Sequence, residues 1–176
     1  WFEQIARIPV EIDVASEFRY REPPIPARSV ALFVSQSGET ADTLAALRYC
    51  AGKADKIMSV VNVPESSIAR ESDLALPIHA GVEIGVASTK AFTCQLTVLF
   101  LLTLKAATDR GEITQEQRQD HLAQLRRLPA LMAEALDQSS AIAATARRLA
   151  SARDVLFLGR GPLYSLAHEG ALKLKE

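Results

Sequence analysis

Three hydroxyl side chains follow an apolar run and precede a helical pattern. The apolar run, residues 30–34, is typical of a buried parallel strand, and Ser35, Ser37 and Thr40 come after it. A strand that turns straight into a helix directs backbone N–H groups and the positive end of the helix dipole into the turn. Gly38 lets the backbone approach a ligand closely. This arrangement suits a phosphate group, but it also fits an ordinary turn in which Ser37 or Thr40 only caps the helix.

A second candidate loop, residues 81–90, follows a predicted strand and precedes the longest helical pattern. Open α/β sheets bind ligands in the loops that follow the carboxyl ends of their strands. Ser88 and Thr89 offer hydroxyl groups to such a ligand. They are equally suited to cap the helix that follows, so both interpretations stay open.

Acidic and basic side chains share one face of the last predicted helix. Glu169, Lys173 and Glu176 recur there at helical spacing. A glutamate at the mouth of a site can transfer a proton next to a carbonyl, with a nearby lysine assisting. The residues alone favour the alternative, an ordinary helical ion pair between Glu169 and Lys173. The histidines are interpreted as structural: His79, His121 and His168.

The composition argues against several classes of function. The 176 residues are 48% hydrophobic and carry a net charge of −1, which gives a real core but no basic excess for nucleic acid. Cys50 and Cys94 lie far apart, which argues against a zinc site and a disulfide framework and favours a reducing compartment. No signal pattern is visible, and the apolar stretch 96–104 is shorter than the roughly 20 residues of a membrane span. We expect a cytoplasmic protein without a metal, nucleic-acid or membrane partner.

Strand-like runs alternate with helical patterns along the first two thirds of the chain. This order predicts an α/β fold with a parallel sheet and right-handed crossovers. A first helix is expected to end by Ile8. Strands are expected at residues 9–14, 30–34, 56–62, 73–78 and 154–158. Further helices are expected at residues 41–50, 66–71, 87–104, 115–136 with Pro129 as a candidate kink, 141–150 and 163–176.

Three motifs, taken together, resemble one enzyme family. They are residues 35–43, residues 83–92, and residues 157–161 with 169–176. The chain is similar over its whole length to the isomerase half of glutamine:fructose-6-phosphate amidotransferase, also called glucosamine-6-phosphate synthase. The first motif alone indicates only the broader sugar isomerase (SIS) domain class, which includes sugar-phosphate-sensing regulators. The other two motifs are more specific to the synthase.

The resemblance implies a SIS-type three-layer αβα fold that binds fructose 6-phosphate or glucosamine 6-phosphate. The family uses no metal or organic cofactor in this half and works as a homodimer. The resemblance assigns the phosphate to Ser35, Gln36, Ser37 and Thr40, the sugar pocket to Val86 and Ser88, and the active-site chemistry to Glu176, which moves a proton between C1 and C2, and Lys173.

The same resemblance implies that the chain is a fragment. We expect a first SIS domain at residues 1–115 without its first strand, a helical connector at residues 116–150, and the start of a second SIS domain at residues 151–176. The glutaminase domain, a Cys-Gly-Thr-Ser loop, a ring-opening histidine and a Schiff-base lysine are not in the sequence. We therefore expect no synthase activity from this chain alone.

Two other functions fit the same candidate phosphate site at residues 35–40, which we call the anion cup. One is a non-catalytic SIS module that senses sugar phosphates, and the other is a related phosphosugar isomerase or deglycase. A pure sensor has no need of a carboxylate base, so Glu176 with Lys173 discriminates against it.

Overall fold

The computed structural model describes residues 1–85 and 88–176 and divides the chain into two compact units. The first unit comprises Trp1–Ile113, and the second unit comprises Thr114–Glu176. The domain borders expected at residues 115 and 150 stay predictions.

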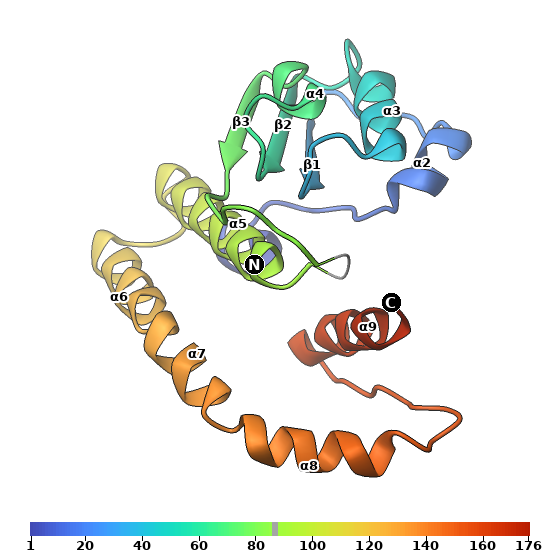
Figure 1. The fold of residues 1–176 in the computed structure, drawn as a ribbon. Helices are drawn as coiled ribbons and strands as arrows, with labels where there is room; N and C mark the ends of the chain where they lie inside the picture. The colour runs from blue at the N-terminus through green and yellow to red at the C-terminus, as the bar shows by residue number, and fades with distance from the viewer. Residues whose placement is uncertain (86–87) are drawn as a thin grey trace. The chain divides into compact units, whose positions relative to one another are not determined.

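Three parallel strands form the sheet of the first unit, in the order β1-β2-β3 (Figure 1). They are β1 (Val30–Ser35), β2 (Lys56–Val61) and β3 (Leu74–Pro77), which confirms three of the expected strands. Val60 of the middle strand lies beside Val34 of β1 and Leu76 of β3. Because the strands run in one direction, the loops that follow them meet at the same edge of the sheet.

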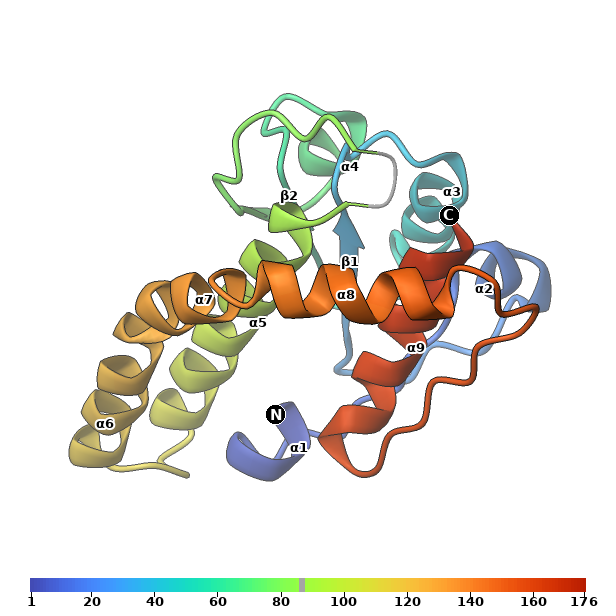
Figure 2. The same ribbon diagram turned by 60° about the horizontal axis from the view of Figure 1, so that its bottom comes forward.

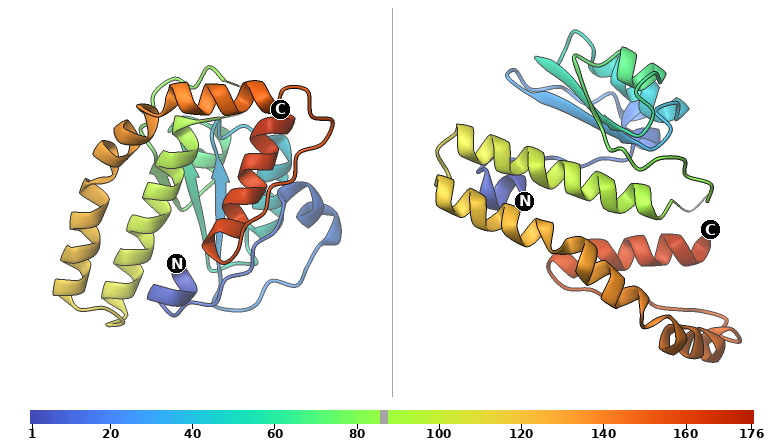
Figure 3. Two further views of the ribbon diagram at one scale, coloured as in Figure 1. Left: turned by 90° about the horizontal axis from the view of Figure 1, so that it is seen from below. Right: turned by 60° about the vertical axis from the view of Figure 1, so that its left-hand side comes forward.

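Helices cover both faces of this sheet, which gives the expected three-layer α/β fold (Figure 3). One face carries α3 (Ala41–Cys50) and α4 (Ser67–Arg70), and α2 (Ala15–Arg21) packs on α3. The other face carries α5 (Lys90–Asp109), and α1 (Phe2–Ile5) contacts α5. Strand residues alternate between the faces. Ile57 and Val61 of β2 pack with Ile68 of α4, whereas Val60 packs with Ala91 of α5.

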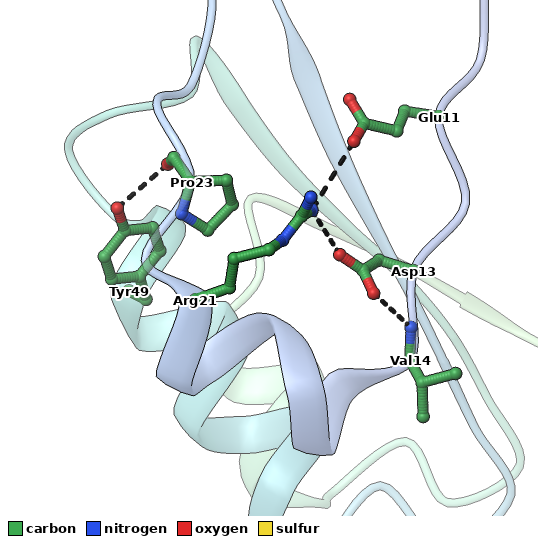
Figure 4. A network of polar contacts seen from close by, with 6 residues as sticks. All are labelled: Glu11, Asp13, Val14, Arg21, Pro23 and Tyr49. Carbon is green, nitrogen blue, oxygen red and sulfur yellow. Dashed lines mark hydrogen bonds and ion pairs between the residues drawn. The ribbon is translucent and has the colours of Figure 1, made fainter.

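The strand expected at residues 9–14 is wrong. This segment pairs with no strand in the described part of the chain, and its Ile12 is 90% exposed. A strand satisfies its backbone groups only through a neighbouring strand, so an apolar pattern alone does not produce one. Side chains hold the segment instead, because Arg21 of α2 forms ion pairs with the carboxylates of Glu11 and Asp13 (Figure 4).

Four helices make up the described secondary structure of the second unit. They are α6 (Gln115–Arg126), α7 (Leu128–Leu136), α8 (Ser139–Leu149) and α9 (Pro162–Lys175), and Figure 2 shows the first three following one another along the chain. The helix expected at residues 115–136 is therefore two helices, and the candidate kink at Pro129 is confirmed as a break in the helix. It is interrupted at Arg127, because Pro129 has no N–H for an interior helical bond and is tolerated only in the first turn of α7.

The strand expected at residues 154–158 is also wrong. Within the described residues no strand pairs with this segment, and Leu156 and Leu158 are 84% and 89% exposed. The ring of Phe157 packs against α9 at Gly170, where an added Cβ would lie 3.0 Å from ring carbons. The segment thus contacts its own helix but has no strand to pair with.

Helix α5 is long and apolar enough to cross a membrane, contrary to the expectation from residues 96–104. The core helix of a soluble domain meets the same criteria, and α5 packs Ala91, Cys94 and Val98 against the sheet. The start expected for this helix, Ala87, lies outside the described residues, and the structure begins α5 at Lys90.

Candidate functional site

The turn between β1 and α3 is held together by the hydroxyl group of Ser35. Ser35 Oγ shares a hydrogen bond of 3.0 Å with Thr40 Oγ1 and accepts the Gly38 N–H at 3.0 Å. Ser35 is only 6% exposed, so both bonds lie at the base of the turn. The six residues expected to form an anion cup therefore make a closed, internally bonded turn at the carboxyl edge of the sheet.

Neither Ser37 nor Thr40 caps helix α3. Thr40 stands at the N-cap position, but its side chain makes no capping hydrogen bond and is bonded to Ser35 instead. Ser37 Oγ accepts the N–H of Glu39, which precedes the helix, at 3.1 Å. The interpretation of these hydroxyls as simple helix caps is therefore wrong. The first turn of α3 receives no side-chain cap, which leaves it suited to an anionic ligand.

Gly38 is required by the geometry of this turn. Its φ of +68° lies in the region that favours glycine, and an added Cβ would meet Ser66 Oγ at 2.0 Å and Ser66 Cβ at 2.4 Å. Its carbonyl accepts the Ile68 N–H at 3.0 Å. The turn is thus packed directly onto the start of α4.

Glu39 binds α4 through its carboxylate, which sequence reasoning did not anticipate. Glu39 Oε1 accepts the Ser67 N–H at 2.7 Å, and this hydrogen bond lowers the pKa of the Glu39 carboxyl group below its ordinary value. The Ser67 partner lies 28 residues away in the chain, and no local pattern signals that contact.

A glutamate caps helix α5 at the end of the second candidate loop. Glu83 Oε2 accepts the N–H groups of Thr89 and Ala91 at 3.3 and 3.0 Å. Thr89 is the N-cap residue, yet its own side chain makes no capping bond. Ser88 is half-buried and has a φ of +44°, a strained conformation for a residue other than glycine. Val86, the other residue assigned to the sugar pocket, lies outside the described residues.

The charged face of α9 contains the expected ion pair. Lys173 Nζ lies 2.8 Å from Glu169 Oε1, and both side chains are mostly covered. Glu176 is exposed and ends the helix, where its N–H donates to the Leu172 carbonyl. Because the cup belongs to the first unit and α9 to the second, the predicted roles of Lys173 and Glu176 at the cup stay predictions.

A tight glycine turn leads into α9. A Cβ on Gly159 would lie 2.1 Å from the Leu163 carbonyl oxygen, so the chain passes the first turn of the helix at a distance that only glycine allows.

Among residues 1–85 and 88–176, the His, Cys, Asp and Glu side chains form no group of three that could hold a metal ion.

Comparison with known proteins identifies the class. The SIS domain family model matches residues 1–105, more than half of the chain, and the chain therefore belongs to the SIS domain family. Over all 176 residues it is 58% identical to glutamine–fructose-6-phosphate aminotransferase (isomerizing) of Zymomonas mobilis. It is 57% identical over the same length to the aminotransferase of that name from Bradyrhizobium diazoefficiens. The chain spans 29% of the length of each of these relatives.

Solved structures agree with this class. The chain superposes along its whole length, with a TM-score of 0.97 and 44% identity, on half of the C-terminal domain of glucosamine-fructose-6-phosphate aminotransferase from Francisella tularensis. The chain also matches a glucosamine-6-phosphate deaminase from Thermotoga maritima, with 23% identity and a TM-score of 0.53. This match covers 68% of the chain and 36% of the deaminase, and it shows that the two proteins share a fold.

Proposed function

We propose that this chain forms part of the sugar-phosphate site in the isomerising half of a glutamine–fructose-6-phosphate aminotransferase. One observation carries the proposal. Residues 35–40 fold into a hydroxyl-lined turn that leaves the start of α3 without a side-chain cap. This turn lies in a chain that is 58% identical over its whole length to an aminotransferase of that name. The uncapped helix start supplies N–H donors and a positive dipole, and the hydroxyls supply further donors, which together suit a phosphate dianion.

The proposed ligands of the phosphate are Ser37, Thr40, Gln36 and Ser35. Ser37 is half-buried and Thr40 is exposed, so a ligand can reach both hydroxyl groups. Ser35 is engaged within the turn, where it holds Thr40 and the Gly38 amide. Ser35 and Thr40 share one hydrogen bond, so in this arrangement only one of the two hydroxyl protons is free to donate to the phosphate: that of Ser35 if Thr40 donates within the pair, and that of Thr40 if Ser35 does.

In the proposed reaction, glutamine and fructose 6-phosphate give glucosamine 6-phosphate and glutamate. Binding energy from the phosphate, which does not react, would fix C1 and C2 of the sugar against the catalytic groups. Glu176 is the proposed base that moves a proton between C1 and C2, and Lys173 is proposed to assist it. A cytoplasmic location and assembly as a homodimer belong to the same proposal.

A non-catalytic sugar-phosphate-binding module is the second candidate. It is favoured by the 2.8 Å ion pair between Lys173 and Glu169, which is an ordinary helical contact and gives Lys173 a structural role. Both candidates share the anion cup, so a binding experiment tests what they have in common.

Replacing Ser37 with alanine tests the cup. We expect glucosamine 6-phosphate to bind the Ser37→Ala chain roughly threefold to tenfold more weakly than the parent, because one hydroxyl donor is lost. Titration followed by NMR chemical shifts measures both affinities.

Ser29→Ala is the matched control. Ser29 donates to the Pro26 carbonyl at 2.7 Å and precedes β1, at the opposite end of the strand from the cup. This variant should bind like the parent. Equal affinity of the Ser37→Ala chain and the parent would remove Ser37 from the site, and no binding by the parent would contradict the proposed function.

A further inference from the structure

One residue contacts both loops of the candidate site. Asn62 follows the middle strand β2, and its backbone N–H donates to the Gln36 carbonyl in the cup at 3.1 Å. Its side chain bonds to the loop after β3, where Nδ2 donates to the Gly81 carbonyl at 2.7 Å and Oδ1 accepts the Ala80 N–H at 3.0 Å. The backbone of Asn62 thus holds one loop and its side chain holds the other.

The topology of the sheet places Asn62 between these loops. The order β1-β2-β3 puts the loop after β2 between the loops after β1 and β3. The pairing of β2 with β3 continues through the Ile78 N–H, which donates to the Val61 carbonyl at 3.0 Å. Beyond that point the Asn62 side chain takes the place of backbone pairing, because its NH₂ group donates to one backbone carbonyl and its amide oxygen accepts one backbone N–H.

The loop held by Asn62 is long and irregular. From Ile78 to Thr89 no helix or strand is present in the described residues, and loops of about this length are uncommon inside a compact domain and are often functional. Its far end is fixed at the start of α5, where the Glu83 carboxylate accepts the N–H groups of Thr89 and Ala91. Its near end is fixed by Asn62. Between these anchors the backbone at Ser88 is held in a strained conformation, which persists only where the surroundings impose it.

The two loops have separate supports. The cup is held by the bonds of Ser35 to Thr40 and to the Gly38 amide, and by the backbone N–H of Asn62. None of these depends on the side chain of Asn62. Removing that side chain therefore frees the near end of the loop after β3, at Ala80 and Gly81, and leaves the cup in place.

We propose that Asn62 is a positioning residue that holds the loop after β3 beside the anion cup and thereby sets affinity for the sugar part of a sugar phosphate. This inference rests on the proposed function. The resemblance implies phosphate recognition at the cup and sugar recognition at the loop, and the two loops can contact one ligand together because loops that follow adjacent parallel strands meet at one sheet edge.

The test compares two ligands on the 176-residue chain and on its Asn62→Ala variant. Glucosamine 6-phosphate requires both loops, whereas inorganic phosphate requires only the cup. We expect the variant to bind glucosamine 6-phosphate about threefold to tenfold more weakly and to bind inorganic phosphate within about twofold of the parent. NMR titrations of both ligands give the ratio of affinities, which a general loss of stability would not change.

Two further variants sharpen the comparison. Asn62→Asp keeps the acceptor for the Ala80 N–H but places an oxygen against the Gly81 carbonyl and adds a negative charge near the cup. It should therefore weaken binding of both ligands, and that of glucosamine 6-phosphate more, so that the same ratio of affinities falls. The Asn62→Asp variant also provides the test of the positioning role if the Asn62→Ala variant does not fold. Gln117→Ala is the matched control, because Gln117 also uses a side-chain amide to bond a backbone N–H, that of Thr114 in the second unit. It should leave both affinities unchanged.

Equal weakening of both ligands, or of neither, would overturn the positioning role. In that case binding of glucosamine 6-phosphate by the parent would still support the proposed function. A parent chain that binds neither ligand would contradict the proposed function, and the role of Asn62 would fall with it.

Discussion

At the residue scale, Gly38 shows how closely the cup is packed against α4. The space beside its Cα is occupied by Ser66, whose hydroxyl group is buried and has no hydrogen-bond partner in the described part of the chain. A buried hydroxyl without a partner costs stability. The buried Ser66 hydroxyl group therefore offsets part of the stability that close packing between the turn and α4 provides.

Gly38→Ala should destabilise the first unit by roughly 2–4 kcal/mol, since both backbone strain and a clash with Ser66 result. Urea unfolding measures the loss. Gly52→Ala is the matched control, because Gly52 has a similar φ of +75° with nothing within 4 Å of the added Cβ. It should cost about 1 kcal/mol, from strain alone. The double variant with Ser66→Gly should recover part of the loss, and no recovery would show that Ser66 is not the obstacle.

At the element scale, two carboxylates connect helix α3 and its preceding turn with the region of α4. Glu39 accepts the Ser67 N–H at the start of α4. Glu71, just after α4, accepts two bonds from Arg48 of α3, at 2.8 and 2.6 Å. The hydrogen bond from Ser67 lowers the pKa of Glu39, and the bonds from Arg48 lower the pKa of Glu71. The Glu39 contact fixes the turn that carries the proposed phosphate ligands, and the Glu71 contact joins the last turn of α3 to the end of α4.

These contacts predict that acid weakens the first unit. A carboxyl group whose pKa is lower in the folded state stabilises the fold above its unfolded pKa, and this contribution is lost as pH falls through the folded pKa. Stability should therefore drop as pH falls below about 4.5. Glu39→Gln and Glu71→Gln should each narrow the difference in unfolding midpoint between pH 6 and pH 3. An unchanged pH dependence in both variants would exclude these carboxylates as its cause.

At the scale of the whole molecule, the chain consists of two units with different kinds of structure. The first has a sheet with helices on both faces, and its core lies along β2. The second is helical and begins with a capping box, in which the Thr114 hydroxyl accepts the Gln117 N–H and the Gln117 side chain accepts the Thr114 N–H. Each unit therefore has its own local source of stability.

Thr114→Ala should weaken the second unit and leave the first unchanged. Loss of the N-cap should cost about 1 kcal/mol in α6, visible as faster hydrogen exchange of its amides. Amides of β2 should exchange as in the parent. Thr145→Ala is the matched control, because Thr145 bonds a carbonyl inside α8 and alanine is the better helix former there. Faster exchange throughout both units after Thr114→Ala would show that they unfold together.

Most of the first unit could be predicted from the sequence because its elements depend on local patterns. The apolar run before Ser35 and the helical pattern after Thr40 describe β1 and α3 without reference to the rest of the chain. The same kind of pattern failed at residues 9–14 and 154–158, because a strand exists only where another strand pairs with it. The break in helix 115–136 could be predicted from the sequence, because its cause, the missing N–H of Pro129, is local.

The sequence by itself determined the class of this protein, its parallel sheet and the position of a hydroxyl-rich turn between a strand and a helix. Only the tertiary structure decided what those side chains contact. Thr40 bonds Ser35 rather than capping α3, Glu83 caps α5, and Asn62 joins the loops after β1 and β3. These contacts arise because parallel strands bring loops that are distant in the chain to one sheet edge, and no spacing along a single segment encodes that proximity.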